Sequence, residues 1–213
     1  MKPWRTQPHS NNAQFTISSV PLGGPLRTLD DLLAHAGNYA GIVMKTAGRL
    51  QPVLFVIGSE GPQMVMPSSM ANDRAKDDFA IVARLLCVAK SATVAVMASE
   101  AWMSLAKPGD SLDTTIPPSQ APDRRELVVI MGEDRARQQQ RFLPIIRNEA
   151  GKFVGFGEFE MPQIDQVVGR FAQFLAPANL PSEQCAKAEA ILRNIGVESG
   201  FRHGTSRPPR YRM

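Results

Sequence analysis

Residues 51–66 read QPVLFVIGSEGPQMVM, and this stretch sets the class of the fold. Two short apolar runs, residues 51–57 and 63–66, flank residues 58–62 (GSEGP), whose glycines and proline are typical of a turn. Strands joined by so short a turn pair antiparallel. The stretch therefore predicts a β-hairpin, and the neighbouring segments are interpreted around it.

A helix is predicted before the hairpin, over residues 28–47. Apolar residues recur there with the i, i+3, i+4, i+7 spacing of an amphipathic helix, Thr28 suits the N-cap, and Asp31 suits the first turn. Gly37 and Gly41 lie inside this helix, and each costs roughly 1 kcal/mol relative to alanine. We therefore expect the helix to pack closely against a partner, and a face of the sheet is the natural one.

A second helix is predicted after the hairpin, over residues 73–91, with Asn72 and Asp73 at its N-terminal cap. Two apolar stripes run along it, one through Phe79 and the other through Ile81. A helix with two such stripes is buried on most of its circumference.

The remaining elements follow in a meander. Residues 93–98 (TVAVMA) predict a central strand, and residues 99–123 predict a long loop of the kind that is often functional. Three further strands are predicted over residues 126–131, 141–147 and 153–159, and two helices over residues 163–175 and 182–195. Pro144 lies inside one of these strands and argues for an edge position or a bulge.

The predicted fold class is α+β: a mainly antiparallel sheet of about five strands covered by helices, in the order α-β-β-α-β-β-β(-β)-α-α. We expect a single domain over residues 27–199, an irregular arm over residues 1–26, and a basic disordered tail over residues 200–213. The element order resembles that of roadblock and longin-type modules, which implies a scaffolding or partner-binding role.

Charge is distributed unevenly along the chain. The 24 basic and 20 acidic residues give a net charge of +4, and the four arginines of residues 200–213 account for that excess. An arginine-rich tail with an aromatic residue suits phosphate contacts and base stacking, although a solvated tail that aids solubility fits the same residues. The candidate nucleic-acid-binding residues are Arg202, Arg207, Arg210, Tyr211 and Arg212.

The sequence has few of the motifs that are typical of metal, nucleotide or membrane binding. It has no CxxC, HExxH or phosphate-binding loop, so we predict neither a metal nor a cofactor, and we assign His35 a structural or surface role. Cys87 and Cys185 fall in predicted helices, as small apolar groups rather than a disulfide. No apolar run reaches the roughly 20 residues of a membrane span, and no secretory signal is recognised, so we expect a cytoplasmic protein without membrane partners.

A polar cluster is predicted where the central strand meets the long loop, and the candidate site residues are Glu100, Trp102, Asp123, Arg124 and Glu126. A hydrolase-type site is one interpretation. The other is that Trp102 covers the end of the sheet while Glu100 forms a solvated ion pair with Arg124 or its neighbour Arg125. A nuclease that adds Lys152 lacks the spacing of carboxylates and lysine that such enzymes use.

Three short motifs resemble those of a group of uncharacterised proteins of phages and other mobile elements of bacteria. They are Lys76 in the second helix, SEAW at residues 99–102, and PDRRE at residues 122–126, within a similar region that covers residues 28–160. The resemblance implies a bacterial or phage setting and brings no assigned activity.

Taken together, these patterns favour a non-enzymatic accessory protein that binds a protein partner or another copy of itself. Two alternatives stay open at this point: a nucleic-acid-associated protein that uses the C-terminal tail, and a hydrolase-type enzyme with a polar site around Glu100, Asp123 and Arg124.

Overall fold

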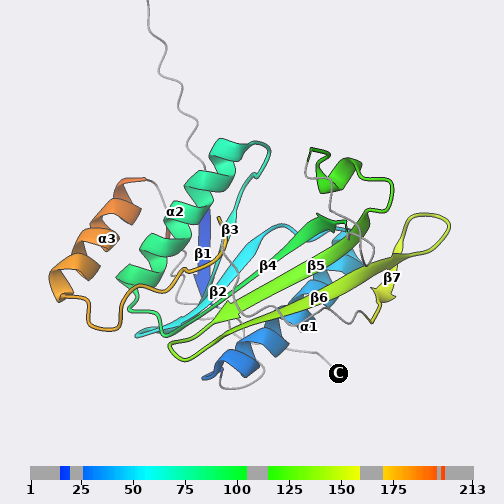
Figure 1. Ribbon diagram of the computed structural model, residues 1–213. Coiled ribbons are helices and arrows are strands. Elements are labelled where there is room, and N and C mark those ends of the chain that lie inside the picture. Colours follow the sequence, from blue (N-terminus) through cyan, green and yellow to red (C-terminus); the bar gives the residue numbers. More distant parts are fainter. Residues whose placement is uncertain (1–14, 20–25, 105–114, 159–169, 196–197, 200–213) are drawn as a thin grey trace, which may run out of the picture.

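The computed structural model describes residues 15–19, 26–104, 115–158, 170–195 and 198–199. Figure 1 shows a twisted sheet with helices on both faces. The strands are β1 (Phe15–Ser19), β2 (Val53–Gly58), β3 (Gly61–Pro67), β4 (Val94–Met103), β5 (Arg125–Glu133), β6 (Gln138–Arg147), β7 (Phe153–Phe156) and β8 (Glu198–Ser199). The helices are α1 (Leu29–Ala47), α2 (Asp73–Ala89) and α3 (Ser182–Asn194), with the short 3-10 helix η1 (Pro118–Gln120).

The sheet has the strand order β7-β6-β5-β4-β2-β3-β1-β8, and every neighbouring pair is antiparallel except β1 with β8. The α+β class and the mainly antiparallel sheet are therefore confirmed, whereas the expected five strands are too few. One reason is β1, which lies in the predicted irregular arm. Its residues Phe15 and Ile17 are buried opposite Pro67 and Val65 of β3, so this part of the arm is integrated into the sheet.

The predicted hairpin is formed by β2 and β3. Leu54 pairs with Val65, and the ladder closes at Gly58 and Gly61. Gly61 has φ +92°, in the left-handed region where a side chain is strained, so a glycine is required there.

Helix α1 begins and ends as its sequence signals predict. Thr28 accepts a hydrogen bond from Asp31 N while the Asp31 carboxylate accepts one from Thr28 N, which makes a capping box. Gly48 closes the helix with φ +73°. Its apolar stripe packs on one face of the sheet, together with residues of β2, β4 and β5.

The expectation that α1 packs closely on a face of the sheet is confirmed, although its own glycines are not the points of closest approach. A Cβ added at Gly37 would lie 3.8 Å from Ile130, and one added at Gly41 would lie 3.8 Å from Phe156, both ordinary van der Waals distances. The close approach is made from the sheet side, because a Cβ added at Gly132 of β5 would lie 2.7 Å from Leu29 of the helix.

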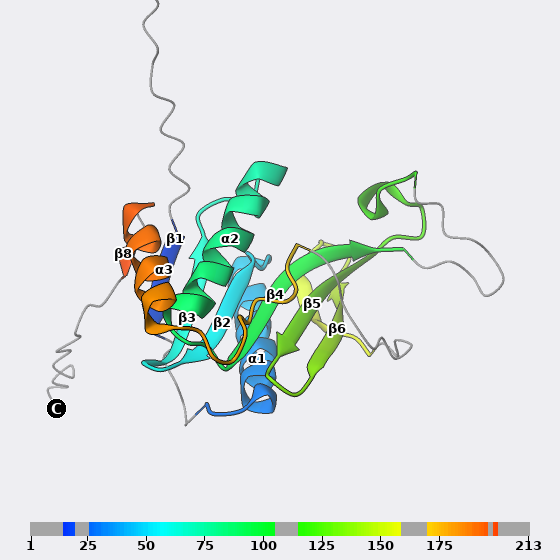
Figure 2. The same ribbon diagram turned by 60° about the vertical axis from the view of Figure 1, so that its left-hand side comes forward.

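Helices α2 and α3 lie side by side on the opposite face (Figure 2). Asn72 caps α2 by accepting a hydrogen bond from Ala75 N at 2.9 Å, as its position predicts. The buried stripe of α2 contains Phe79, and Ile81 is exposed, so the second predicted stripe is buried only in part.

Strands β2 and β4 are covered on both faces. Leu54 and Met97 belong to the cluster under α2, while Phe55 and Val96 belong to the cluster under α1. Strands buried on both faces read as continuous apolar runs, which explains why residues 51–57 and 93–98 show no polar alternation.

Strand β4 continues well past the predicted end of the central strand. Residues 99–103, predicted as the start of a long loop, pair with β5 from Ser99 with Val129 to Met103 with Arg125. The prediction missed this extension because backbone pairing with β5, not apolar character, keeps these residues in the sheet. Residues 105–114 of the predicted loop lie outside the described residues.

Pro144 lies in β6, which pairs with both β5 and β7, so the expected edge position is wrong; the irregularity in the β6–β7 register falls two residues later, between Ile146 and Arg147. The carbonyl of Pro144 accepts a hydrogen bond from Gly157 N at 2.8 Å, on the side away from β5. Its nitrogen points the same way, so the missing N–H leaves the ladder with β5 intact. β7 ends at Phe156, earlier than predicted.

The predicted helix over residues 163–175 is wrong in its described part, because residues 170–175 have no helical structure. The N–H groups of Phe174 and Leu175 donate to the carboxylate of Glu133 instead of to helical carbonyls. Residues 163–169 lie outside the described residues, as does the predicted tail over residues 200–213.

Candidate functional site

The predicted polar residues gather at the distal end of the sheet, where β4 and β5 extend beyond the start of β2. β2 first pairs with β4 at Ala98, while β5 follows β4 to Met103. Trp102 stands directly opposite Glu126 on β5. Figure 1 shows the end of β4 and β5 reaching past the helices toward η1.

Glu126 is held by an arginine that the sequence reasoning did not select. Arg147 of β6 donates to both carboxylate oxygens of Glu126, at 2.8 and 2.7 Å, and also to the carbonyl of Gly48 at 3.2 Å. Hydrogen bonding to Glu126 raises the pKa of Arg147. The arginine thus joins β5 and β6 to the C-terminal end of α1, where a cation also favours the helix dipole.

Glu100 lies on the same face of the sheet as Trp102 and Glu126, and its side chain is half-buried. Its Oε1 accepts a hydrogen bond from Leu50 N at 2.6 Å. Burial raises the pKa of Glu100, the bond from Leu50 lowers it in part, and the neighbouring charge of Glu126 raises it further. Glu100 therefore ties the segment after α1 to β4, and it does not form the ion pair with Arg124 that one interpretation predicted.

Trp102 and Asp123 have different partners. The guanidinium of Arg124 lies 5.3 Å from the ring centroid of Trp102, a cation–π contact, while Ser104 Oγ donates to Asp123 at 2.7 Å. Ser104 is four residues beyond Glu100, about 13 Å along an extended strand. Glu100 and Asp123 therefore belong to separate contacts at this end of the sheet.

Lys152, the fourth residue of the nuclease alternative, lies in the turn between β6 and β7. Its N–H donates to Asn148 Oδ1 at 3.0 Å, and the residue is exposed. The carboxylates of Glu100 and Glu126 already accept hydrogen bonds from protein groups. The contacts of Glu100 and Glu126 suit a structural junction between α1, β4, β5 and β6, and the exposed Trp102 lies beside this junction.

Exposed large apolar residues are concentrated at this distal end. Pro144 of β6 pairs with Leu127, so Ile146 lies on the face of the sheet opposite to Trp102 and Glu126. The helix η1 packs on β4 just after the exposed Ile116. The members and their exposed fractions are Trp102 (45%), Ile116 (42%), Ile146 (46%) and Val154 (54%).

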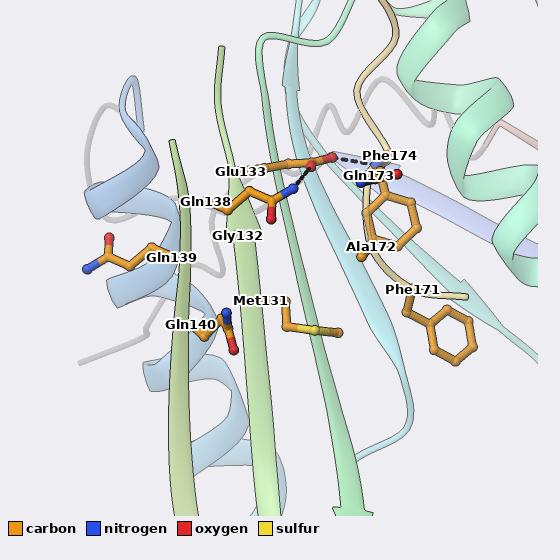
Figure 3. Close-up of a pocket in the computed structure, with 10 residues that line it drawn as sticks. All are labelled: Met131, Gly132, Glu133, Gln138, Gln139, Gln140, Phe171, Ala172, Gln173 and Phe174. Carbon is orange, nitrogen blue, oxygen red and sulfur yellow. Dashed lines mark hydrogen bonds between the residues drawn. The ribbon is translucent and has the colours of Figure 1, made fainter. Parts of the chain in front are cut away.

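A second hollow lies on the α2 side of the sheet, between the ends of β5 and β6 and residues 171–174 (Figure 3). It is a shallow space of about 260 Å³ that is open to solvent. Met131 and Phe171 give it an apolar lining, and the Glu133 carboxylate points to the main chain at Phe174.

The histidines and cysteines take structural places where they are described. His35 of α1 packs edge-on against Phe55, and burial lowers its pKa. Cys87 is buried in α2, where burial raises the pKa of its thiol, and Cys185 of α3 lies 3.6 Å from Ser91 Oγ.

No group of three or more His, Cys, Asp or Glu side chains within the described residues is arranged to hold a metal ion. None of the described helices is long and apolar enough to cross a bilayer. The candidate nucleic-acid residues Arg202, Arg207, Arg210, Tyr211 and Arg212 lie outside the described residues, so their role stays a prediction.

Comparison of the chain with protein-family models, with curated proteins and with solved structures gives no significant match. The resemblances to roadblock and longin-type modules and to phage proteins therefore stay predictions from the sequence.

Proposed function

We propose that this chain is a non-enzymatic accessory protein of a bacterium or phage, and that it binds a protein partner or another copy of itself. Its contact surface is the distal surface, defined as Trp102 and Arg124 at the end of the β4–β5 ladder. The observation that carries the proposal is the exposed indole of Trp102 under the Arg124 guanidinium.

Tryptophan and arginine are the side chains most enriched at the energetic centres of protein interfaces. A large ring that is already stacked against a guanidinium loses little conformational freedom on binding. Ile116, Ile146 and Val154 add exposed apolar area at the same end of the molecule, on more than one side of the sheet.

The backbone at Trp102 is held in the β4–β5 ladder. Glu126 lies opposite it there, and two hydrogen bonds from Arg147 tie Glu126 to β6. An aromatic side chain on a paired strand is a favourable starting point for recognition, because the backbone that carries it is already ordered when the partner arrives.

The hydrolase-type alternative has less support. Its acids Glu100 and Glu126 are engaged by Leu50 N and Arg147, and Asp123 accepts from Ser104 on the other side of Trp102. The cytoplasmic location and the nucleic-acid alternative rest on the sequence alone and remain predictions.

The test compares three full-length proteins: wild type, Trp102→Ala and Ile81→Ala. Ile81 is the matched control, because it is an exposed apolar residue (55%) on α2, away from the distal surface. Light scattering after size-exclusion chromatography measures self-association over a wide concentration range. Quantitative mass spectrometry of proteins captured from a bacterial lysate measures partner binding.

We expect Trp102→Ala to reduce self-association, or the capture of one defined protein, at least tenfold, as the loss of an interface centre does, while Ile81→Ala has no such effect. A wild-type chain that stays monomeric and captures nothing in a manner dependent on Trp102 contradicts the proposal.

A further inference from the structure

Residues 170–176 (RFAQFLA), here called the strap, lie between α2 and β5 on the α2 side of the sheet. The strap has no regular secondary structure, and Gln173 within it has φ +57°, which is unfavourable for a residue with a side chain. Because it has no helical or strand pairing of its own, other parts of the chain must satisfy its main-chain groups.

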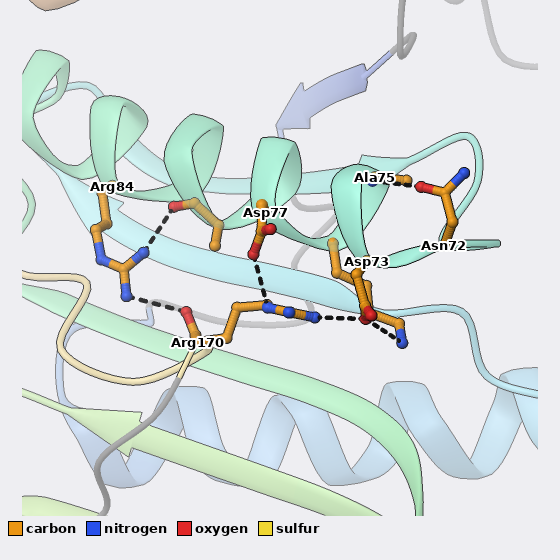
Figure 4. A network of polar contacts seen from close by, with 8 residues as sticks. Asn72, Asp73, Ala75, Asp77, Arg84 and Arg170 are labelled. Carbon is orange, nitrogen blue, oxygen red and sulfur yellow. Dashed lines mark hydrogen bonds and ion pairs between the residues drawn. The ribbon is translucent and has the colours of Figure 1, made fainter.

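Charged side chains hold the carbonyl groups of the strap. Arg84 of α2 donates to the carbonyl of Arg170 at 2.9 Å (Figure 4) and to that of Ala172 at 3.0 Å. Arg135, just beyond β5, donates to the carbonyl of Ala176. Both ends of the strap are therefore held through main-chain oxygens.

The N–H groups of the strap are held by a single carboxylate. Glu133 is buried at the end of β5, and its Oε1 accepts from both Phe174 N and Leu175 N, the latter at 2.8 Å. Its other oxygen accepts from Gln138 at 3.3 Å (Figure 3). Hydrogen bonds to a charged group are stronger than neutral ones, so Glu133 is the principal attachment at the centre of the strap.

Two aromatic side chains of the strap enter the core. The ring of Phe171 lies 6.1 Å from that of Phe79, and Phe174 is buried under the Arg84 guanidinium at 5.6 Å. At the surface, the Arg170 side chain adds ion pairs to the N-terminal turns of α2 (Figure 4).

We propose that the strap is a releasable element of the fold: it opens as one unit while the sheet and α1 stay folded, and it uncovers an apolar cleft between α2 and β5. The contacts of Arg84, Glu133 and Arg135 with its main chain supply the closing force, together with the burial of Phe174 in the core cluster under α2. The cleft extends the hollow beside Met131 and exposes Phe79.

Cooperative opening makes a specific demand on the amide of Leu175. It bonds to Glu133 and has no contact with Arg84 among the hydrogen bonds and ring contacts of the described residues, whereas the Phe174 ring lies under the Arg84 guanidinium. If the strap opens as a unit, weakening the Arg84 contacts must still release the amide of Leu175.

The experiment is NMR-detected hydrogen exchange on the full chain, for wild type and for the variants Arg84→Lys, Glu133→Gln and Glu100→Gln. Lysine keeps the charge but lacks the guanidinium nitrogen Nη2, which donates to both strap carbonyls. Glu100→Gln is the matched control, because Glu100 is another shielded carboxylate that accepts a main-chain N–H, on the α1 side of the sheet.

We expect Arg84→Lys and Glu133→Gln each to speed exchange at Phe174 and Leu175 by about tenfold to a hundredfold, with the amides of β4 unchanged. Glu100→Gln should leave the two strap amides as in wild type. Unchanged strap amides in Arg84→Lys, or equal acceleration in β4, overturn the proposal.

The wild-type chain provides an independent test, because it does not depend on whether a variant folds. At low concentrations of urea, the amides of Phe174 and Leu175 should share one opening free energy that lies below that of the β4 amides. If strap and β4 amides exchange through the same opening event, the strap is an integral part of the core and the proposal is wrong.

Discussion

Replacing Gly58 with alanine tests how the hairpin is joined to the rest of the sheet. Gly58 ends β2 against the turn that follows α2, where Ser59 N donates to the Lys90 carbonyl at 2.9 Å and Thr93 N donates to the Ile57 carbonyl at 2.9 Å. An added Cβ would overlap the carbonyl oxygen of Lys90 and lie 2.9 Å from its Cβ. Main-chain atoms cannot rotate away as a side chain can, so the two segments must separate.

The expected cost has three parts. Overpacking costs about 1–3 kcal/mol, and weakening of the two hydrogen bonds adds about 1–2 kcal/mol, while alanine recovers about 0.5–1 kcal/mol by restricting the unfolded chain. We expect Gly58→Ala to lower the free energy of unfolding by about 2–3 kcal/mol. For a chain of this length the melting temperature should then fall by roughly 4–12 °C.

Urea unfolding followed by circular dichroism measures the change, with Gly37→Ala as the matched control. Gly37 lies inside α1, where an added Cβ meets Ile130 at an ordinary 3.8 Å. The control should therefore gain about 0.5–1 kcal/mol from helix propensity. A Gly58→Ala protein as stable as wild type would refute the reasoning, because the close contact with Lys90 would then have no energetic weight.

Two further predictions concern α1 and its junction with the sheet. Because burial raises the pKa of Glu100, the folded state favours its protonated form. Wild type should therefore lose stability relative to Glu100→Gln as the pH rises above about 4.3. Urea unfolding of both proteins at pH 4 and pH 7 measures this, and a stability difference that is constant with pH contradicts it. Thr28→Ala removes one half of the capping box and should lower the free energy of unfolding by about 1 kcal/mol, which is a fall of roughly 2–4 °C in melting temperature. Thr46→Ala, on the exposed side of the same helix, is the control and should change the melting temperature little.

The parts of the fold that the sequence predicts well are those with local signals. The caps of α1 and α2 at Thr28 and Asn72, and the turn between β2 and β3, each depend on residues a few positions apart. Strand β1 also carries a local signal, since residues 15–18 (FTIS) alternate apolar and polar residues, and the two apolar ones are buried. The strand was missed because it covers only five residues, while the polar composition of residues 1–26 as a whole predicts an irregular arm.

The missed features depend on contacts between distant parts of the chain. Phe171, Phe174 and Leu175 have helical spacing, but the carboxylate of Glu133 takes the N–H groups that a helix needs. The distal site is similar: the sequence brings Trp102 and Arg124 to attention, whereas Arg147 lies twenty-one residues beyond Glu126 and shows no motif. Only the pairing of β5 with β6 places them together.

The division of the interior into two clusters affects how substitutions combine. Adjacent residues of β2, such as Leu54 and Phe55, are buried under different helices, while residues two apart, such as Leu54 and Val56, share one cluster. Double mutants of neighbours in sequence should therefore be nearly additive, and double mutants two apart should not be. In this strand, residues next to each other in sequence are therefore the weakly coupled ones, and residues two apart are the strongly coupled ones. A screen of paired variants would reveal which helix covers which residue.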